Sequence, residues 1–168
     1  CVCEIILKSK EDAQMLDPSD PGWEPSSIAD IATMVVDDDP MITKIVEAAL
    51  LNMGMTNVYA INDPRQAMDF LAEGIGGVQL IICDLQMPDV SGIDVLEQVR
   101  LDFPDLPFLM LTANRSPDAV SKAVGKGVSS YMVKPFQLGE LQDRVWQLIN
   151  RRDRGLGKES NLPGSLNS

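Results

Sequence analysis

The central part of the chain alternates between short apolar runs and longer segments in which apolar residues recur with a helical period. This alternation is typical of parallel strands joined by crossover helices, because helices then cover both faces of the sheet. Each apolar run has the length of a single strand. The predicted strands are Ala32–Asp37, Asn57–Ile61, Gln79–Asp84, Phe108–Ala113 and Ser130–Val133.

The segments between the strands carry helix signals. One apolar stripe, closed by Gly54, consists of Ile42, Ile45, Val46, Ala49, Leu50 and Met53. The last stripe consists of Leu138, Leu141, Val145, Leu148 and Ile149. Three helices are predicted to begin at an oxygen-bearing cap followed by proline, at Asp39-Pro40, Asp63-Pro64 and Ser116-Pro117. Five strands alternating with five helices predict an α/β fold, a doubly wound parallel sheet with helices on both faces.

Composition changes at both ends of this alternating core. Residues 1–30 are acidic, with clustered prolines and no sustained period, and we expect a mostly disordered N-terminal arm. Residues 153–168 are rich in Gly, Ser, Asn and Pro and are expected to form a flexible C-terminal tail. The folded domain is therefore predicted over residues 31–152. Because the chain begins at Cys1 rather than Met, we expect a fragment, a processed product or an expressed derivative.

Charge narrows the possible functions. The 168 residues include 25 acidic and 14 basic side chains, for a formal net charge of −11, and no histidine. So acidic a chain does not attract a phosphate backbone, and we expect no nucleic-acid partner. Without histidine, the chain supplies no Ser-His-Asp triad, no histidine zinc ligand and no phosphohistidine. No apolar stretch approaches the ~18 residues of a spanning helix, so we expect a cytoplasmic protein without membrane association.

Polar side chains follow four of the predicted strands at their carboxyl ends, the edge where α/β sheets bind ligands. They are Asp37, Asp38, Asp84, Thr112 and Lys134. Neighbouring carboxylates repel one another, which raises their pKa values unless a cation lies among them. Carboxylate oxygens with room for water suit Mg²⁺, which keeps positions for substrate oxygens. This edge of the sheet therefore suits the binding of a phosphoryl group.

Four motifs, in order and at the ends of the predicted strands, resemble the receiver domain of two-component response regulators, in a layout similar to the single-domain chemotaxis type. They are MVVDDDP at 34–40, IICDLQMPD at 81–89 followed by Gly92, LTA at 111–113 and YMVKPF at 131–136. The resemblance covers the predicted domain. It implies a flavodoxin-like (βα)5 fold with five parallel strands in the order 2-1-3-4-5.

The resemblance also implies a phospho-accepting signalling switch that catalyses only its own phosphorylation and dephosphorylation. Asp84 would be the phospho-acceptor, taking the group from the phosphohistidine of a sensor histidine kinase or a histidine phosphotransfer protein. Asp38, Asp84 and the backbone carbonyl of Gln86 would hold Mg²⁺, with Asp37 acting directly or through water. Lys134 would pair with a phosphoryl oxygen.

A conformational switch is implied by the same resemblance. Thr112 would donate its hydroxyl to the phosphoryl group and move toward it, and the Tyr131 ring would turn into the vacated space. This would change the face formed by the fourth helix, the fifth strand and the fifth helix, to which a downstream protein target, not identified by the sequence, would bind. The Lys134–Pro135 peptide is expected to be cis.

Two positions depart from common family patterns, Gln86, where Asn is frequent, and Asn114. Both flank the route of water to the phosphoryl group, which leaves the lifetime of the phosphorylated state open. An aspartate-dependent phosphatase of the haloacid dehalogenase type is an alternative, since residues 37–39 offer an Asp-x-Asp motif. Its further acidic pair would have to be Glu140 and Asp143, on an amphipathic helix. A receiver-like scaffold that works without phosphorylation is disfavoured, because every expected active-site residue is present.

Overall fold

In the computed structural model of the chain, the described residues are 27–74, 77–113 and 116–153. They form one five-stranded sheet in the order β2-β1-β3-β4-β5, and every pair of neighbouring strands is parallel. The strands are β1 (Ala32–Val36), β2 (Val58–Ile61), β3 (Val78–Asp84), β4 (Phe108–Thr112) and β5 (Ser130–Val133). The flavodoxin-like strand order is confirmed, and the predicted strand ends differ from the observed ones by at most one residue.

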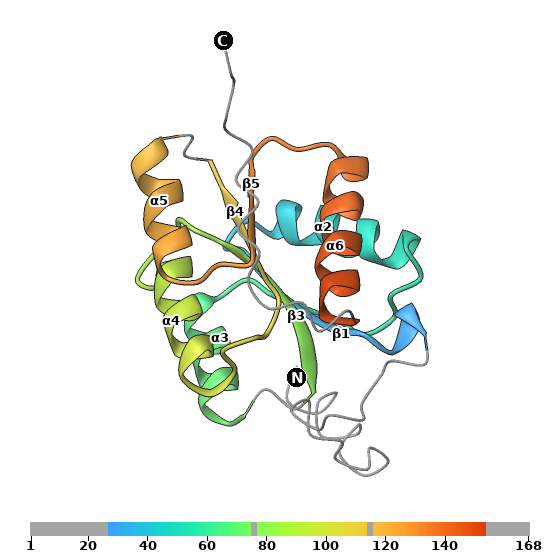
Figure 1. Cartoon of the computed structure of the whole chain (residues 1–168), viewed down its shortest axis with the longest axis horizontal. Coiled ribbons are helices and arrows are strands. Elements are labelled where there is room, and N and C mark those ends of the chain that lie inside the picture. The colour runs from blue at the N-terminus through green and yellow to red at the C-terminus, as the bar shows by residue number, and fades with distance from the viewer. Residues whose placement is uncertain (1–26, 75–76, 114–115, 154–168) are drawn as a thin grey trace.

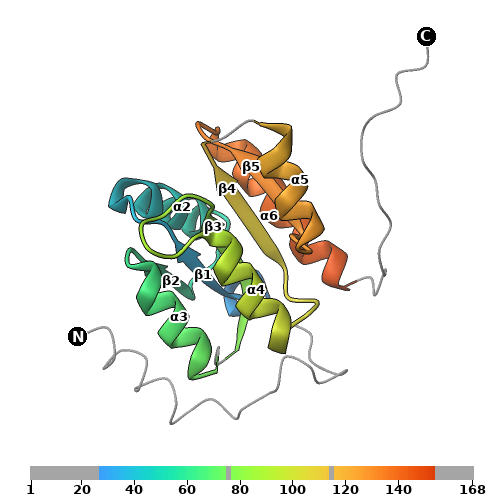
Figure 2. The same cartoon turned by 90° about the vertical axis from the view of Figure 1, so that its left-hand side faces the viewer.

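Helices cover both faces of this sheet. They are α2 (Pro40–Asn52), α3 (Pro64–Ala72), α4 (Gly92–Asp102), α5 (Pro117–Gly125) and α6 (Leu138–Asp153). Figure 1 shows α2 and α6 on one face and α3, α4 and α5 on the other, and Figure 2 shows the latter group in front of the sheet. The doubly wound arrangement is therefore confirmed. None of the helices in the described ranges is long and apolar enough to cross a membrane.

Each face of the sheet packs its own apolar cluster, because side chains of successive strand residues point to opposite faces. Met34 and Val36 of β1 pack with α3 and α4 residues such as Leu71 and Leu96. Val35, between them, packs on the opposite side with α2 and α6 residues. All five residues of β1 and all seven of β3 are buried, as expected for the central strands of a parallel sheet.

Side-chain caps fix where the helices begin. Asp39 accepts a hydrogen bond from the Met41 N–H, and Asp63 accepts one from the Arg65 N–H, each just before a proline. These two predicted caps are confirmed, and α5 begins at Pro117 as predicted. Ser91 caps α4 in a reciprocal arrangement with Asp94, whose carboxylate accepts a hydrogen bond from the Ser91 N–H. These four helices therefore start after the carboxyl ends of β1, β2, β3 and β4.

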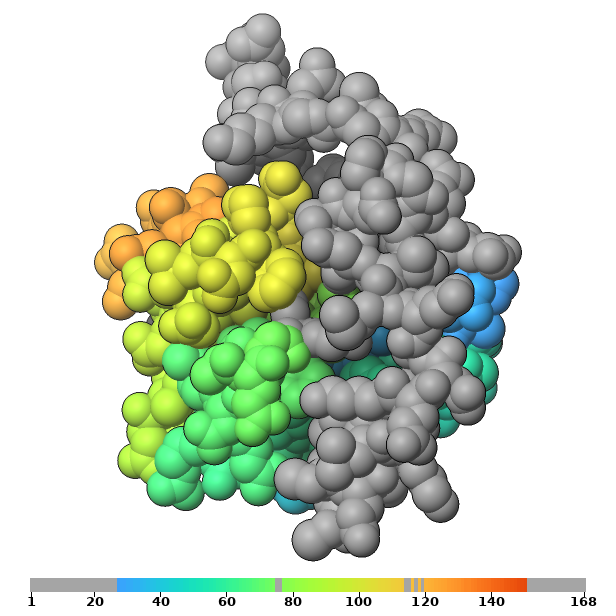
Figure 3. Space-filling model, turned by 90° about the horizontal axis from the view of Figure 1, so that it is seen from below, coloured from blue at the N-terminus to red at the C-terminus, as the bar shows by residue number. Residues whose placement is uncertain are grey.

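The N-terminal boundary of the fold differs from the predicted one. Ile28–Asp30, predicted to belong to the disordered arm, form a short 3-10 helix, η1, capped by Ser27. Side chains of Thr56 and Asn57 donate hydrogen bonds to the Ala29 carbonyl, which hold η1 against the edge where the strands begin. Three residues are too few to show a helical period, so the pattern missed them. Figure 3 shows η1, in blue, at the surface in the view from below.

The C-terminal helix is longer than its apolar stripe. The stripe ends at Ile149, whereas α6 continues to Asp153, the first residue of the predicted tail. The remainder of the predicted arm, residues 1–26, and of the predicted tail, residues 154–168, lies outside the described residues.

Candidate functional site

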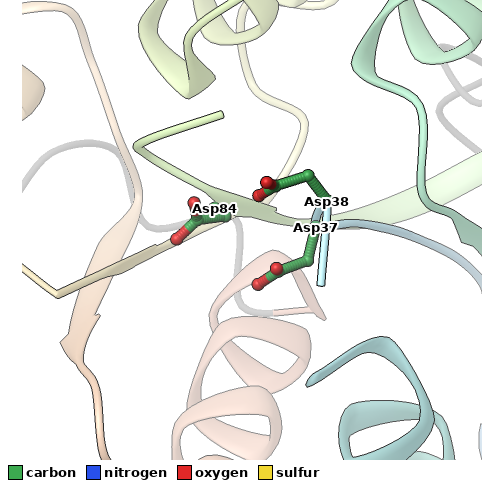
Figure 4. Close-up of side chains that lie close together, drawn as sticks. All are labelled: Asp37, Asp38 and Asp84. Carbon is green, nitrogen blue, oxygen red and sulfur yellow. The ribbon is translucent and has the colours of Figure 1, made fainter. Parts of the chain in front are cut away.

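Three carboxylates meet where the central strands β1 and β3 end. Asp37 and Asp38 directly follow β1, and Asp84 is the last residue of β3, one position beyond the register pair Val36 and Cys83. One oxygen atom of each carboxylate lies within 4.8 Å of one of each of the others. Figure 4 shows the Asp37 and Asp38 carboxylates directed toward the side on which Asp84 lies. Asp37 and Asp84 are buried and Asp38 is exposed, so the group could hold a metal ion that solvent reaches.

Lys134 brings a positive charge to the two buried carboxylates. Its Nζ lies 2.5 Å from Asp37 Oδ2 and 2.8 Å from Asp84 Oδ1. The residue directly follows β5, and its N–H donates to the Thr112 carbonyl at 2.7 Å, which extends the pairing of β4 with β5. The peptide bond to Pro135 is cis, as expected. Because the ammonium group bridges both acids, it offsets their mutual repulsion.

The pKa values of this group reflect burial and pairing. Burial raises the pKa of Asp37 above its ordinary value, although the hydrogen bonds from Lys134 and from the Asp39 N–H oppose the effect. Burial alone would lower the pKa of Lys134, but its hydrogen bonds to Asp37 and Asp84 outweigh this, and the Lys134 pKa is raised. The lysine is therefore charged at neutral pH and serves as a fixed cation beside the carboxylates.

The loop after β3 holds the Asp84 carboxylate from its other side. The Gln86 N–H donates to Asp84 Oδ2 at 3.0 Å. Gly92 starts α4 so close to the strand that a Cβ atom there would lie 2.2 Å from the Asp84 carbonyl oxygen. Asp89, between them, has a φ of 64°, a left-handed conformation that Asp and Asn tolerate better than most residues. The Asp84 carboxylate is thus fixed by Lys134 on one oxygen and by backbone on the other.

The other predicted site residues lie on β4 and β5. Thr112 is buried at the end of β4, one position past the register pair of Asp84 with Leu111. The structure therefore brings Thr112 to the same edge as the acids. Tyr131 pairs in register with Met110 on β4. It is 40% exposed and is not part of the cluster of Asp37, Asp38, Asp84 and Lys134. Asn114 lies outside the described residues.

One polar residue of this edge was missed by the sequence analysis. Asn62 follows β2, and its Nδ2 donates to the Asp37 carbonyl and to Thr43 Oγ1, each at 2.9 Å. A signal was present in the sequence, because Asn62 directly follows the predicted strand Asn57–Ile61, as the predicted site residues follow the other four strands. Applying the same rule to β2 finds Asn62.

Two of the acidic residues invoked for a phosphatase, Asp39 and Glu140, make hydrogen bonds at helix starts. Asp39 caps α2, and the Glu140 carboxylate accepts a hydrogen bond from the Gln137 N–H at the start of α6. Within residues 27–74, 77–113 and 116–153, the group of Asp37, Asp38 and Asp84 is the one set of acids arranged to hold a metal. Neither Glu140 nor Asp143 belongs to this group.

Comparison with known proteins identifies the family. Residues 33–146 match the model of the response regulator receiver domain. The chain belongs to this family. It is 36% identical over 129 residues to the two-component response regulator ORR22 of Oryza sativa subsp. indica, and 34% identical over 126 residues to ARR2 of Arabidopsis thaliana. These matches cover 77% and 75% of this chain and 18% of each relative, so the receiver domain spans about a fifth of the length of these relatives.

Solved structures agree with the receiver fold. The chemotaxis response regulator CheY4 of Vibrio cholerae is 27% identical with a TM-score of 0.64, covering 70% of this chain and 98% of that one. A receiver domain protein from Clostridium thermocellum, at 23% identity and a TM-score of 0.68, covers 75% of this chain and 99% of its own, and supports the fold alone. The receiver domain is a signalling module of two-component systems, and the comparisons give no support to the phosphatase alternative.

Proposed function

We propose that Asp84 is the phospho-acceptor of this receiver domain. The observation that carries the proposal is the Lys134 ammonium group, which contacts both buried acids while Asp38 stays open to solvent beside them. An Asp84 oxygen would form a bond to the phosphorus of a phosphohistidine. The P–N bond would break, and the imidazole would leave with the electron pair. These 168 residues contain no histidine, and we propose that the phosphoryl group comes from a sensor histidine kinase or a histidine phosphotransfer protein.

Magnesium is the ion that this set of ligands suits best. Asp37, Asp38, Asp84 and the backbone carbonyl of Gln86 would hold Mg²⁺ through hard oxygen atoms. The bound ion supplies charge that offsets repulsion between the Asp84 carboxylate and an anionic phosphoryl group. Lys134 already bonds to Asp84 Oδ1 and would pair with a phosphoryl oxygen, and Thr112 would donate its hydroxyl to another.

The output surface in this proposal is the face formed by α5, β5 and α6. These elements correspond to the fourth helix, the fifth strand and the fifth helix of the sequence analysis. Exposed apolar side chains lie on all three elements, among them Val124, Tyr131 and Trp146. Thr112 moving toward the phosphoryl group would let the Tyr131 ring turn inward, which would change this face for a protein target. We further infer that the domain acts in the cytoplasm, without contact to nucleic acid or membrane.

Intact-mass measurement after incubation with acetyl phosphate and Mg²⁺ tests the proposal. We expect the wild type to gain one phosphoryl group, and we expect no gain in Asp84→Asn or after removal of Mg²⁺ with a chelator. Asp89→Asn is the matched control, because it removes an exposed carboxylate five residues away at a position whose left-handed backbone Asn also tolerates. A wild type that gains no phosphoryl group would contradict the proposal.

A further inference from the structure

Asn62 connects β2 to the loop that carries the acids. Its Nδ2 atom has two hydrogens, and the structure gives each of them an acceptor, the Asp37 carbonyl oxygen and Thr43 Oγ1, both at 2.9 Å. Thr43 lies in the first turn of α2, is 2% exposed, and donates its own hydroxyl to the Pro40 carbonyl at 3.1 Å. The Asn62 amide thus joins the end of β1 to the start of α2.

The Asp37 carbonyl belongs to the peptide group that links Asp37 to Asp38. Fixing this oxygen fixes the plane of that peptide and, with it, the direction in which the Asp38 side chain leaves the backbone. The Asp37 carboxylate has its own restraints, from Lys134 and from the Asp39 N–H at 3.0 Å. In the described part of the chain, no donor bonds to the exposed Asp38 carboxylate. Its placement therefore depends on the backbone that Asn62 holds.

We infer that Asn62 is a positioning residue for the divalent metal site, which it serves by orienting the Asp37–Asp38 peptide so that the Asp38 carboxylate faces Asp84. Groups that orient metal ligands without touching the metal contribute strongly to affinity, and their loss typically weakens it by about tenfold or more. The role rests on the proposed metal binding by Asp38. It needs two donors on one atom, which a primary amide provides and a carboxylate of the same shape does not.

The test is a titration of the full chain with Mn²⁺, followed by electron paramagnetic resonance of the free ion, with Mg²⁺ as competitor. Mn²⁺ suits the same oxygen ligands. We expect the Kd of Asn62→Ala to rise about tenfold over that of the wild type. Asn57→Ala is the matched control, since Asn57 is also exposed and donates its amide to a backbone carbonyl, that of Ala29, at the opposite end of β2. Its Kd should stay at the wild-type value.

A second substitution and a metal-free spectrum separate positioning from general loosening of the fold. Asn62→Leu, similar in volume and without donors, should weaken Mn²⁺ binding like Asn62→Ala. In metal-free protein, the Asp38 amide resonance should shift in both Asn62 variants and remain in place in Asn57→Ala. An Asn62→Ala Kd within twofold of the wild type, beside a wild type that binds Mn²⁺, would overturn this inference alone. A wild type that binds no Mn²⁺ would overturn the proposed function as well.

Discussion

Arg100 is a half-buried positive charge at the end of α4. Its Nε donates to the Gly127 carbonyl, Nη1 donates to the carbonyls of Phe103 and Leu106, and Nη2 donates to Ser129 Oγ. Burial lowers the pKa of the guanidinium, although the charge of Asp105 opposes the effect. A planar group with five donors satisfies all of these acceptors at once. The residue thus joins the end of α4 to the starts of β4 and β5.

Replacing Arg100 by Lys should lower the free energy of unfolding by about 2 kcal/mol, because an ammonium group cannot reach acceptors spread over three segments and leaves some of them, such as the carbonyl of the buried Leu106, unpaired. Urea unfolding followed by circular dichroism measures the change. Arg65→Lys serves as control, since the Arg65 side chain is 68% exposed and pairs with two acids at the surface, Asp63 and Asp89. A loss in Arg100→Lys no larger than in Arg65→Lys would contradict the role of the fork-shaped group.

Cys83 lies next to Asp84, and its surroundings make its thiol unreactive. The thiol is fully buried beside Asp84, and burial together with the nearby carboxylates raises the pKa of Cys83 well above its ordinary value. A protonated, inaccessible thiol is a poor nucleophile. The Cys83 thiol therefore does not compete with the Asp84 carboxylate, which is the reacting group in the proposed function.

The connection from β3 to α4 is held close to the end of β3. Gly92 is buried, and its N–H donates to the Leu85 carbonyl at 3.0 Å. A Cβ atom on residue 92 would lie 2.2 Å from the Asp84 carbonyl oxygen and 2.9 Å from Met110 Sδ. The backbone oxygen cannot move aside without displacing Asp84, so only glycine fits here.

Gly92→Ala should therefore lower the free energy of unfolding by about 2 kcal/mol, the usual cost of forcing a group into a packed site. Gly139→Ala is the control within a helix, because nothing lies within 4 Å of a Cβ atom at that position of α6. The control should raise stability by about 0.5 kcal/mol through the lower entropy of the unfolded chain. Chemical denaturation of both variants checks the pair, and equal effects would contradict the steric argument.

The elements that the sequence predicted are those with long periodic or fully apolar patterns. The strands around Val35 and Ile82 and the helix ending near Asn52 were found because burial imposes their pattern on every residue. The η1 helix and the contacts of Arg100 were not found, since they depend on single hydrogen bonds between distant segments. The pattern of apolar residues along a segment does not predict such contacts, because they form only when the folded chain brings distant segments together.

In the candidate site, too, the residues could be predicted from local pattern, whereas their contacts could not. Asp37, Asp38, Asp84, Thr112 and Lys134 could be predicted because parallel strands bring their carboxyl ends to one edge. Which atoms meet there could not be predicted: that Lys134 bridges two of the acids follows from the path of the chain after β5. Asn62 could be predicted as a polar residue that follows a strand, but its hydrogen bond to the Asp37 carbonyl could not.

The proposed metal binding at the carboxylate cluster would be coupled to the folding of the whole domain. The native state gathers three acids at one edge, whereas the unfolded chain separates Asp38 from Asp84, so a divalent ion should bind the folded form alone. An ion concentration 100 times Kd then adds about 2.7 kcal/mol to the free energy of unfolding. Chemical denaturation of the wild type across a Mg²⁺ series should show stability rising with the logarithm of the concentration above Kd.

Substitutions of the neighbouring residues Asp38 and Asp39 distinguish specific Mg²⁺ binding from general screening of negative charge. Asp38→Asn should abolish most of the Mg²⁺-dependent gain while leaving metal-free stability nearly unchanged, because Asp38 is exposed and accepts no hydrogen bond in the described part of the chain. Asp39→Asn removes the same charge one residue away, and Asn caps α2 as well as Asp does, so its gain should equal that of the wild type. If both variants lose the gain equally, Mg²⁺ acts by screening the acidic surface. If only Asp38→Asn loses it, the ion stabilises the native state through the cluster at the end of β1 and β3.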